Sequence, residues 1–226
     1  LGQDGKVRAV VLCGEGTDFC AGIEISVFAG DGIGASLGDL LAPQTESGAN
    51  YFQNAAMCWR DLPVPVIAAL QGSVFGAGLQ IAMGADLRYA AADARLSIME
   101  IKWGLIPDMA LTATLPPLLA EDKVRELAYT GRLVPAEEAV SLGLVTAIVD
   151  EPLASATAVA HEIASKSPDA IRAIKRLTAA AWRGNVAETL RLEAELQAAI
   201  MAGENQKEAA MANLQNRPPV FTDRES

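Results

Sequence analysis

The sequence has few basic and few aromatic residues, and the first shortage narrows the possible partners. Its 226 residues include 18 lysines and arginines against 28 aspartates and glutamates, so the formal net charge is −10. Nucleic acids and anionic membranes are bound through basic surfaces that release counterions, and we therefore expect neither as a partner. A small ligand that carries phosphate groups needs only a local basic patch and is compatible with this charge.

Histidine is almost absent, which argues against several kinds of catalysis. The single histidine, His161, lies among Ala, Val and Glu in a predicted helix, where we expect a solvent-exposed position. A Ser-His-Asp or Cys-His mechanism needs a histidine base beside its nucleophile. A metal site would need carboxylates alone, and no group of Asp and Glu has suitable spacing. The sequence thus predicts neither a histidine-dependent nucleophile nor a bound metal.

Cysteines and long apolar runs are also scarce. Cys13, Cys20 and Cys58 are an odd set without CxxC spacing, which favours free thiols in a reducing compartment and hence a cytoplasmic location. The apolar runs are too short to cross a bilayer, and no basic signal peptide opens the chain. The chain begins at Leu1 and enters a predicted strand almost at once, so we expect that an N-terminal piece is missing.

What the sequence does have is half hydrophobic residues with abundant Ala and Gly, as expected for a core in which backbones approach closely. Short apolar runs predict five buried strands, over residues 7–12, 64–70, 87–91, 96–99 and 144–149. Phe52, Ala55, Ala56 and Trp59 recur at helical spacing, and residues 78–85 predict a second, shorter helix. Strands that alternate with helices indicate an α/β architecture with covered sheets.

The predicted strands stop after residue 150. Segments rich in Ala, Glu and Leu then predict four helices, over residues 152–165, 168–182, 186–201 and 205–214. We therefore divide the chain into an α/β core, residues 1–150, and a C-terminal helical segment, residues 151–226. Residues 30–48 are rich in Gly, Ser and Pro without a clear period, and they predict a long loop near a site.

Two glycine-containing turns are the main candidates for a functional site. Gly76-Ala77-Gly78 follows a predicted strand and opens a helix, but Ile81 occupies the place of the third small residue in a dinucleotide-binding fingerprint. Free N–H groups at such a turn can instead bind an oxygen that gains negative charge. A similar turn at residues 19–24 follows the first predicted strand. If the two turns lie on adjacent strands, they can converge on one thioester oxygen.

In this order and spacing, the sequence resembles the crotonase (enoyl-CoA hydratase/isomerase) family over essentially its whole length. The resembling segments are residues 7–12, 19–24, 63–72, 76–78, 85–88, 100–108 and 136–145. The resemblance implies a spiral of ββα repeats followed by a helical segment that drives trimer formation, so a homotrimer or a dimer of trimers is expected. It also implies an acyl-CoA thioester as substrate, with coenzyme A as part of that substrate and no separate cofactor.

The resemblance assigns roles to both turns. The family's two oxyanion-hole donors fall on the backbone N–H groups of Ile23 and Ala77. Ala21, Gly22 and Gly76 fall at positions that contact the substrate or its CoA. Because the two donors are main-chain groups, the identity of the side chains there is almost free, apart from a need for a small residue at position 77.

The family's two acid/base positions fall on residues 80 and 100, and only one carries an acid. Glu100 is the expected catalytic carboxylate, whereas Gln80 departs from the pattern. An amide can orient water or substrate by hydrogen bonds but cannot exchange a proton near neutral pH, so Gln80 is placed with the substrate-binding residues. A solvated carboxylate, or one paired with Lys102, is the alternative interpretation of Glu100.

Asp108 is a second candidate acid, eight residues after Glu100. A carboxylate at that offset resembles the pattern of the Δ3,5-Δ2,4-dienoyl-CoA isomerases, although those enzymes also place an acid at position 80. A cap on the helix expected after Pro107 is the alternative role for Asp108.

Three functions stay open on the sequence. Shifting a double bond needs one carboxylate and an oxyanion hole, so Glu100 without an acid at position 80 favours an enoyl-CoA isomerase. An enoyl-CoA hydratase in which Gln80 orients water is the second. The third is a homologue that binds acyl-CoA without catalysis.

Overall fold

The computed structural model describes residues 1–24, 37–182, 184–201 and 203–223, so residues 30–36 of the predicted loop lie outside the described residues. Contacts divide the chain into two units. The core unit comprises residues 11–61 and 66–156. The tail unit comprises residues 1–10, 62–65 and those from 157 onward. The division at residues 1–150 and 151–226 stays a prediction.

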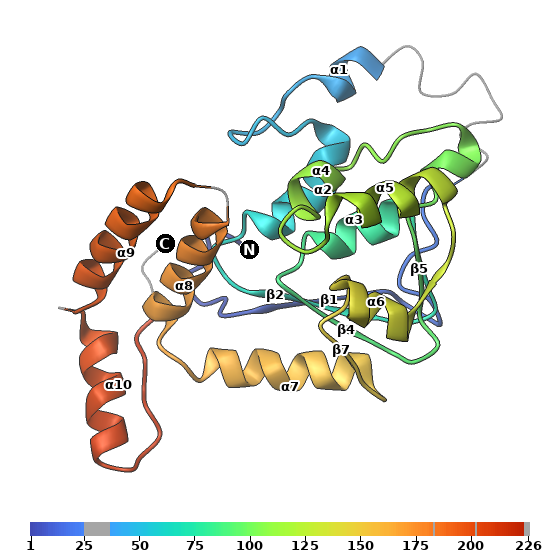
Figure 1. The fold of residues 1–226 in the computed structure, drawn as a ribbon. Helices are drawn as coiled ribbons and strands as arrows, with labels where there is room; N and C mark the ends of the chain where they lie inside the picture. The colour runs from blue at the N-terminus through green and yellow to red at the C-terminus, as the bar shows by residue number, and fades with distance from the viewer. Residues whose placement is uncertain (25–36, 183, 202, 224–226) are drawn as a thin grey trace. The chain divides into compact units, whose positions relative to one another are not determined.

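The core unit contains two sheets (Figure 1). The first has the order β1 (Val10–Cys13), β2 (Val66–Leu70), β4 (Leu87–Ala90) and β7 (Ala147–Ile148), and β4 is parallel to both β2 and β7. The second has the order β3 (Ser73–Phe75), β5 (Arg95–Ser97) and β6 (Val134–Pro135), with β3 parallel and β6 antiparallel to β5. All five residues of β2 are buried, as expected for a strand covered on both faces.

The predicted strands are found, with shifted ends. The runs 64–70 and 87–91 contain β2 and β4, whereas 7–12 begins to pair only at Val10 and 144–149 shrinks to β7. The run 96–99 is displaced to β5, so its last two residues are not strand. Sequence patterns missed β3 and β6. The first has three residues between Gly72 and Gly76, and the second has two and contains Pro135, so neither is long enough to show a period.

Both predicted core helices are present. The helix α2 (Tyr51–Arg60) starts with a capping box, in which Asn50 and Gln53 satisfy each other's backbone N–H groups. The helix α3 (Ala77–Met83) is short and mostly buried. The helix expected after Pro107 is α4 (Leu111–Thr114). Other helical elements were not predicted: α1 (Leu37–Leu41), α5 (Glu121–Thr130), α6 (Ala136–Leu142) and the 3-10 helix η2 (Glu100–Trp103).

All four predicted C-terminal helices are confirmed to within one residue at each end. They are α7 (Pro152–Ala164), α8 (Pro168–Ala181), α9 (Val186–Met201) and α10 (Glu204–Leu214). Within the tail unit, Asn205 of α10 donates to the Asp169 carboxylate of α8 at 2.9 Å. Lys175 of α8 donates to the carbonyl oxygen of Val64 at 2.9 Å, and Arg8 pairs with Asp223. These contacts explain why the N-terminal residues group with the helices.

Arg88 is a buried, charged residue that stabilises the first sheet. It is only 4% exposed, and its guanidinium donates to the carbonyl oxygens of Leu144 at 2.7 Å and Ala85 at 2.6 Å. Burial lowers the pKa of Arg88 to about 10, so the side chain is still charged at neutral pH. It thereby holds the chain before β4 and the chain before β7 together.

We predict that Arg88→Met lowers the free energy of unfolding by about 2–4 kcal/mol, because two carbonyl oxygens lose their donor inside the protein. Urea denaturation measures this change. Arg95→Met is the matched control, since Arg95 lies exposed on β5 and its loss should cost under about 0.5 kcal/mol. Equal effects of the two substitutions would contradict the role assigned to Arg88.

Candidate active site

The site is set by the register of parallel neighbours in the second sheet. Cys20 forms a parallel bridge with Val74 of β3, and Val74 pairs in parallel register with Leu96 of β5. Chains that run in the same direction leave a sheet at the same edge, so the segments after these three residues meet at that edge. Ile23 and Ala77 each come three residues after the first two, and Glu100 comes four residues after Leu96.

The first turn is held against β3 by its backbone. Cys20 donates to the carbonyl oxygen of Ser73 at 3.0 Å and accepts from the N–H of Phe75 at 2.9 Å. Gly22 has φ +103°, a conformation that side chains disfavour, and an added Cβ would lie 3.2 Å from the Phe75 carbonyl oxygen. The turn follows β1 in the sequence, as expected. It pairs with β3, the strand that leads into the second turn, so the two turns follow adjacent chain segments, although sequence patterns missed β3 itself.

The second turn leads from β3 into α3. Gly76 has φ +51° and donates to the Ser97 carbonyl oxygen at 3.0 Å, and the helix starts at Ala77. The first N–H groups of a helix have no partner inside it. Among the described residues, no acceptor is found for the backbone N–H of Ala77 or for that of Ile23. The two predicted oxyanion donors are therefore available to a ligand.

Glu100 begins η2 and is 9% exposed. Its Oε2 atom is buried and has no hydrogen-bond partner among the described residues, whereas Oε1 accepts from Gln80. Burial raises the pKa of Glu100, and the negative charge of Asp108 adds to this, against the lowering effect of the hydrogen bonds. A carboxyl group with a raised pKa is suited to both taking and returning a proton.

Gln80 contacts Glu100 directly. The side chain is 1% exposed, and its Nε2 donates to Glu100 Oε1 at 2.6 Å. Its Oε1 accepts from the backbone N–H of Met109 at 2.8 Å. The residue does not line the cavity beside Glu100, so its amide acts on the carboxylate and on the chain at Met109.

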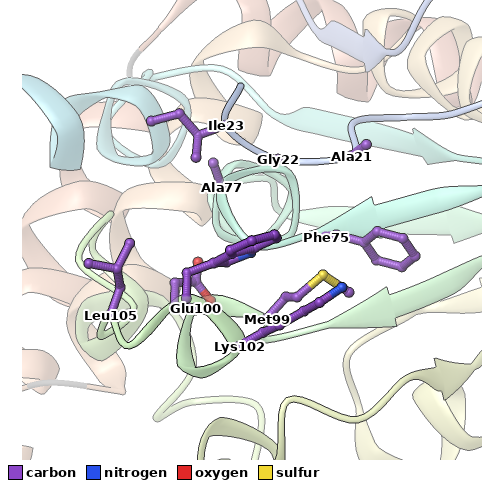
Figure 2. A pocket seen from close by; sticks show the side chains of 11 residues that line it. Ala21, Gly22, Ile23, Phe75, Ala77, Met99, Glu100, Lys102 and Leu105 are labelled. Atoms are coloured by element: carbon purple, nitrogen blue, oxygen red, sulfur yellow. The ribbon is translucent and has the colours of Figure 1, made fainter. Parts of the chain in front are cut away.

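A cavity of about 280 Å³ brings most of the predicted site together. Its lining consists of Ala21, Gly22, Ile23, Phe75, Gly76, Ala77, Met99, Glu100, Lys102, Trp103 and Leu105. In the view of Figure 2, the two turns with Ile23 and Ala77 lie on one side and Glu100 and Lys102 on the other. The cavity thus has the two turns on one side and a carboxylate on the other, and apolar side chains complete its lining.

Five lining residues were not predicted: Phe75, Met99, Lys102, Trp103 and Leu105. Each lies within five residues of a predicted site residue, and Lys102, Trp103 and Leu105 also lie in the resembling segment 100–108, which are signals that could have found them. Lys102 lies with its Nζ 5.2 Å from the centre of the Trp103 ring. No ion pair between Lys102 and Glu100 is found in the described part of the chain, so the pairing considered from the sequence is wrong.

Asp108 lies outside the cavity lining and is exposed. It does not cap the helix expected after Pro107, because α4 starts at Leu111 with Ala110 as its N-cap and no side-chain cap bond. Its effect on the site is electrostatic, through the pKa of Glu100. A direct catalytic role for Asp108 stays a prediction.

Metal binding and membrane insertion find no support in the described part of the chain. Within the described ranges, no group of three His, Cys, Asp or Glu side chains lies close enough to hold a metal ion. Nor does any described helix combine the length and apolarity needed to cross a membrane. His161 is exposed, as expected, and the three cysteines form no disulfide.

Comparisons with known proteins all find members of one family. The family model described as enoyl-CoA hydratase/isomerase matches residues 1–224. A probable enoyl-CoA hydratase of Bacillus subtilis is 33% identical, covering 96% of this chain and 83% of its own length. The human mitochondrial Δ3,5-Δ2,4-dienoyl-CoA isomerase is 30% identical over 96% of this chain and 68% of its own. A crystal structure of enoyl-CoA hydratase from Bacillus anthracis, 28% identical, superposes with a TM-score of 0.86 over 97% of this chain and 83% of its own.

We predict that Glu100 titrates above the ordinary range of a glutamate, and that Asp108→Asn lowers its pKa without returning it to that range. Removing the charge of Asp108 removes a like-charge repulsion, but burial, the larger cause, is unchanged. Carboxyl-carbon NMR on labelled protein, assigned with Glu100→Gln, measures both pKa values. Asp93→Asn is the control, since this exposed acid is not among the groups that shift the pKa of Glu100. An unshifted Glu100 in the wild type would contradict the prediction.

Proposed function

Since the chain belongs to the crotonase (enoyl-CoA hydratase/isomerase) family of acyl-CoA enzymes, we propose that it moves a double bond in an enoyl-CoA thioester. The observation that carries this proposal is the pairing of one buried carboxylate, Glu100, with an amide, Gln80, at 2.6 Å. Adding water across a double bond is helped by two groups that exchange protons, whereas isomerisation needs one. Gln80 cannot be the second such group.

The reaction is balanced with Glu100 as both base and acid. The Glu100 carboxylate removes a proton from the α-carbon of a 3-enoyl thioester. The electron pair left on that carbon delocalises through the double bond and onto the thioester oxygen. The resulting dienolate takes the same proton back from Glu100 at the γ-carbon, which gives the 2-enoyl thioester. No water, oxidant or second acid is consumed.

The backbone donors supply the other requirement. The N–H groups of Ile23 and Ala77 have no acceptor among the described residues, and each follows a strand residue of the same parallel row. A thioester oxygen placed between them receives two hydrogen bonds as it gains charge. Donors fixed before the reaction need no reorganisation, and each one typically contributes about 10²–10³-fold to the rate. The apolar side chains of Phe75, Met99 and Leu105 suit the acyl chain.

Two predictions from the sequence belong with this proposal. We expect a homotrimer or a dimer of trimers, and exposed apolar side chains on α9, among them Val186 at 76% and Leu190 at 60%, agree with subunit contacts there. We also expect a cytoplasmic enzyme, on the ground of its free cysteines.

We predict that Glu100→Gln lowers isomerisation of 3-enoyl-CoA by about 10²–10⁴-fold, because it removes the only group that carries the proton. In the wild type, kcat/KM should fall as the pH decreases through the raised pKa of Glu100, since only the carboxylate form acts as a base. Assays of 3-enoyl-CoA and 2-enoyl-CoA with coupled product detection measure both reactions. Glu121→Gln, an exposed acid paired with Arg125, is the control.

Three outcomes of that assay would count against the proposal. Hydration without isomerisation would indicate an enoyl-CoA hydratase in which Gln80 orients water. Binding of acyl-CoA without any turnover would indicate a non-catalytic homologue. A Glu100→Gln variant with the wild-type rate would move the chemistry to another residue.

We predict that Ala77→Pro lowers kcat by about 10²–10³-fold, the usual loss for one oxyanion donor. Proline removes the N–H, yet it is tolerated at the first position of a helix, where that N–H has no helical partner. Ala77→Ser keeps the N–H and is the matched control, and thermal denaturation of both variants checks the fold. Retention of the wild-type kcat by a folded Ala77→Pro protein would remove Ala77 from the oxyanion hole.

A further inference from the structure

We propose that Gln80 is a positioning residue that holds Glu100 with Oε1 as a permanent hydrogen-bond acceptor, so that Oε2 alone carries the proton. This inference deepens the proposed function and depends on it for the identity of the reaction. It reinterprets the residue that departs from the family pattern. Gln80 is then neither a lost acid nor a water-binding group, but the source of a hydrogen bond that cannot be lost by titration.

The orientation of the Gln80 amide is determined by its two partners. The Met109 group at 2.8 Å is a backbone N–H, which can only donate, so the atom facing it must be the amide oxygen. The NH₂ group therefore faces Glu100. The reverse orientation would set two donors against each other at Met109 and two oxygens against each other at Glu100.

The orientation of Gln80 in turn assigns the two oxygens of Glu100. Oε1 accepts from Gln80 at 2.6 Å and is best suited to this when it carries no proton. Oε2 is buried and has no partner among the described residues. We therefore assign the proton that Glu100 carries to Oε2, the oxygen without another partner. Gln80 itself is 1% exposed, so its amide is shielded from bulk water.

A carboxyl group at position 80 would behave differently. With oxygens as close as the present 2.6 Å contact, two carboxylates cannot both be ionised, and one proton would be shared between them. Such a pair keeps the arrangement only while it holds that proton. The amide donates at every pH. Gln80 thus allows Glu100 to act as a single base over a wider pH range than a pair of acids would allow.

The bond to Met109 adds a second constraint. It ties Gln80 on α3 to the chain after η2, which contains the cavity residue Leu105 and the exposed Asp108. The bond therefore restrains the segment that carries Asp108, whose charge raises the pKa of Glu100, while Lys102 on η2 also lines the cavity. Losing the Gln80 amide would free the carboxylate and this segment together.

The test compares Gln80→Met and Gln80→Glu across pH. Methionine has a similar shape without hydrogen bonds, so we expect kcat to fall about 10- to 100-fold from the misplaced carboxylate, with KM changed less than about 3-fold. The acid limb of kcat/KM should move to higher pH, because the buried carboxylate loses the hydrogen bond that lowers its pKa. Gln71→Met, which removes an exposed amide bonded to Gly16, should change neither quantity.

The Gln80→Glu variant should restore activity at low pH and lose it as the pH rises. While the pair of acids holds one proton, the introduced carboxyl group can donate to Glu100 as the amide did. Once that proton is lost, the donor disappears, which adds an alkaline limb that the wild type lacks. If Gln80 had a purely structural role, its substitution would lower the melting temperature without moving the acid limb or adding an alkaline limb.

An unmoved acid limb in Gln80→Met, or a Gln80→Glu profile equal to that of the wild type, would overturn the proposal. Carboxyl-carbon NMR of Glu100 in the ligand-free protein separates this failure from failure of the proposed function. If no thioester is isomerised but the pKa of Glu100 rises in Gln80→Met, the positioning role stands and the reaction is wrong. If isomerisation occurs and that pKa is unchanged, the reaction stands and the positioning role is wrong.

Discussion

The parallel row formed by Cys20, Val74 and Leu96 is the constraint on which the rest of the site depends. It places two turns and a 3-10 helix at one edge of the small second sheet, and so brings Ile23, Ala77 and Glu100 to one cavity. None of these three groups is close to another in sequence. A slip of one residue in either pairing would turn the following segment to the opposite face, so the register determines which residues meet at the cavity.

The small residues of this sequence have a physical role around this row. A Cβ on Gly78 would lie 2.4 Å from the Cys20 carbonyl oxygen, and one on Gly76 would lie 3.3 Å from Glu100 Oε1. The helix α3 therefore reaches the first turn only because it starts with small residues. Backbone packed against backbone leaves N–H groups exposed to a ligand, which larger side chains would cover. We therefore expect the composition that makes this core close-packed also to keep the predicted oxyanion donors accessible.

How much could be predicted from the sequence depended on the length of each element. The helices α7–α10 span eleven or more residues, and their ends were predicted to within one residue, whereas α2 was predicted from its period alone and α5, also ten residues long, was missed. β3, β6 and η2 have two to four residues and no period, yet β3 and η2 supply the row and Glu100. The resemblance to a family assigned roles to Ile23, Ala77 and Glu100, whereas Trp103 and Leu105 lie in the resembling segment 100–108 without having been given a role. The contact between Gln80 and Glu100 joins side chains 20 residues apart, which no local pattern records.

The burial of Glu100 also explains why its charge depends on the residue at position 80. Burial makes the charged carboxylate costly, and a hydrogen bond to Oε1 offsets part of that cost while Oε2 stays without a partner among the described residues. If the neighbour were an acid, the same contact would depend on a proton, and the two groups would titrate together. An amide removes that dependence and leaves one proton-carrying group. Under the proposed function, the residue at position 80 therefore separates chemistry that needs two exchangeable protons from chemistry that returns one proton to a different carbon.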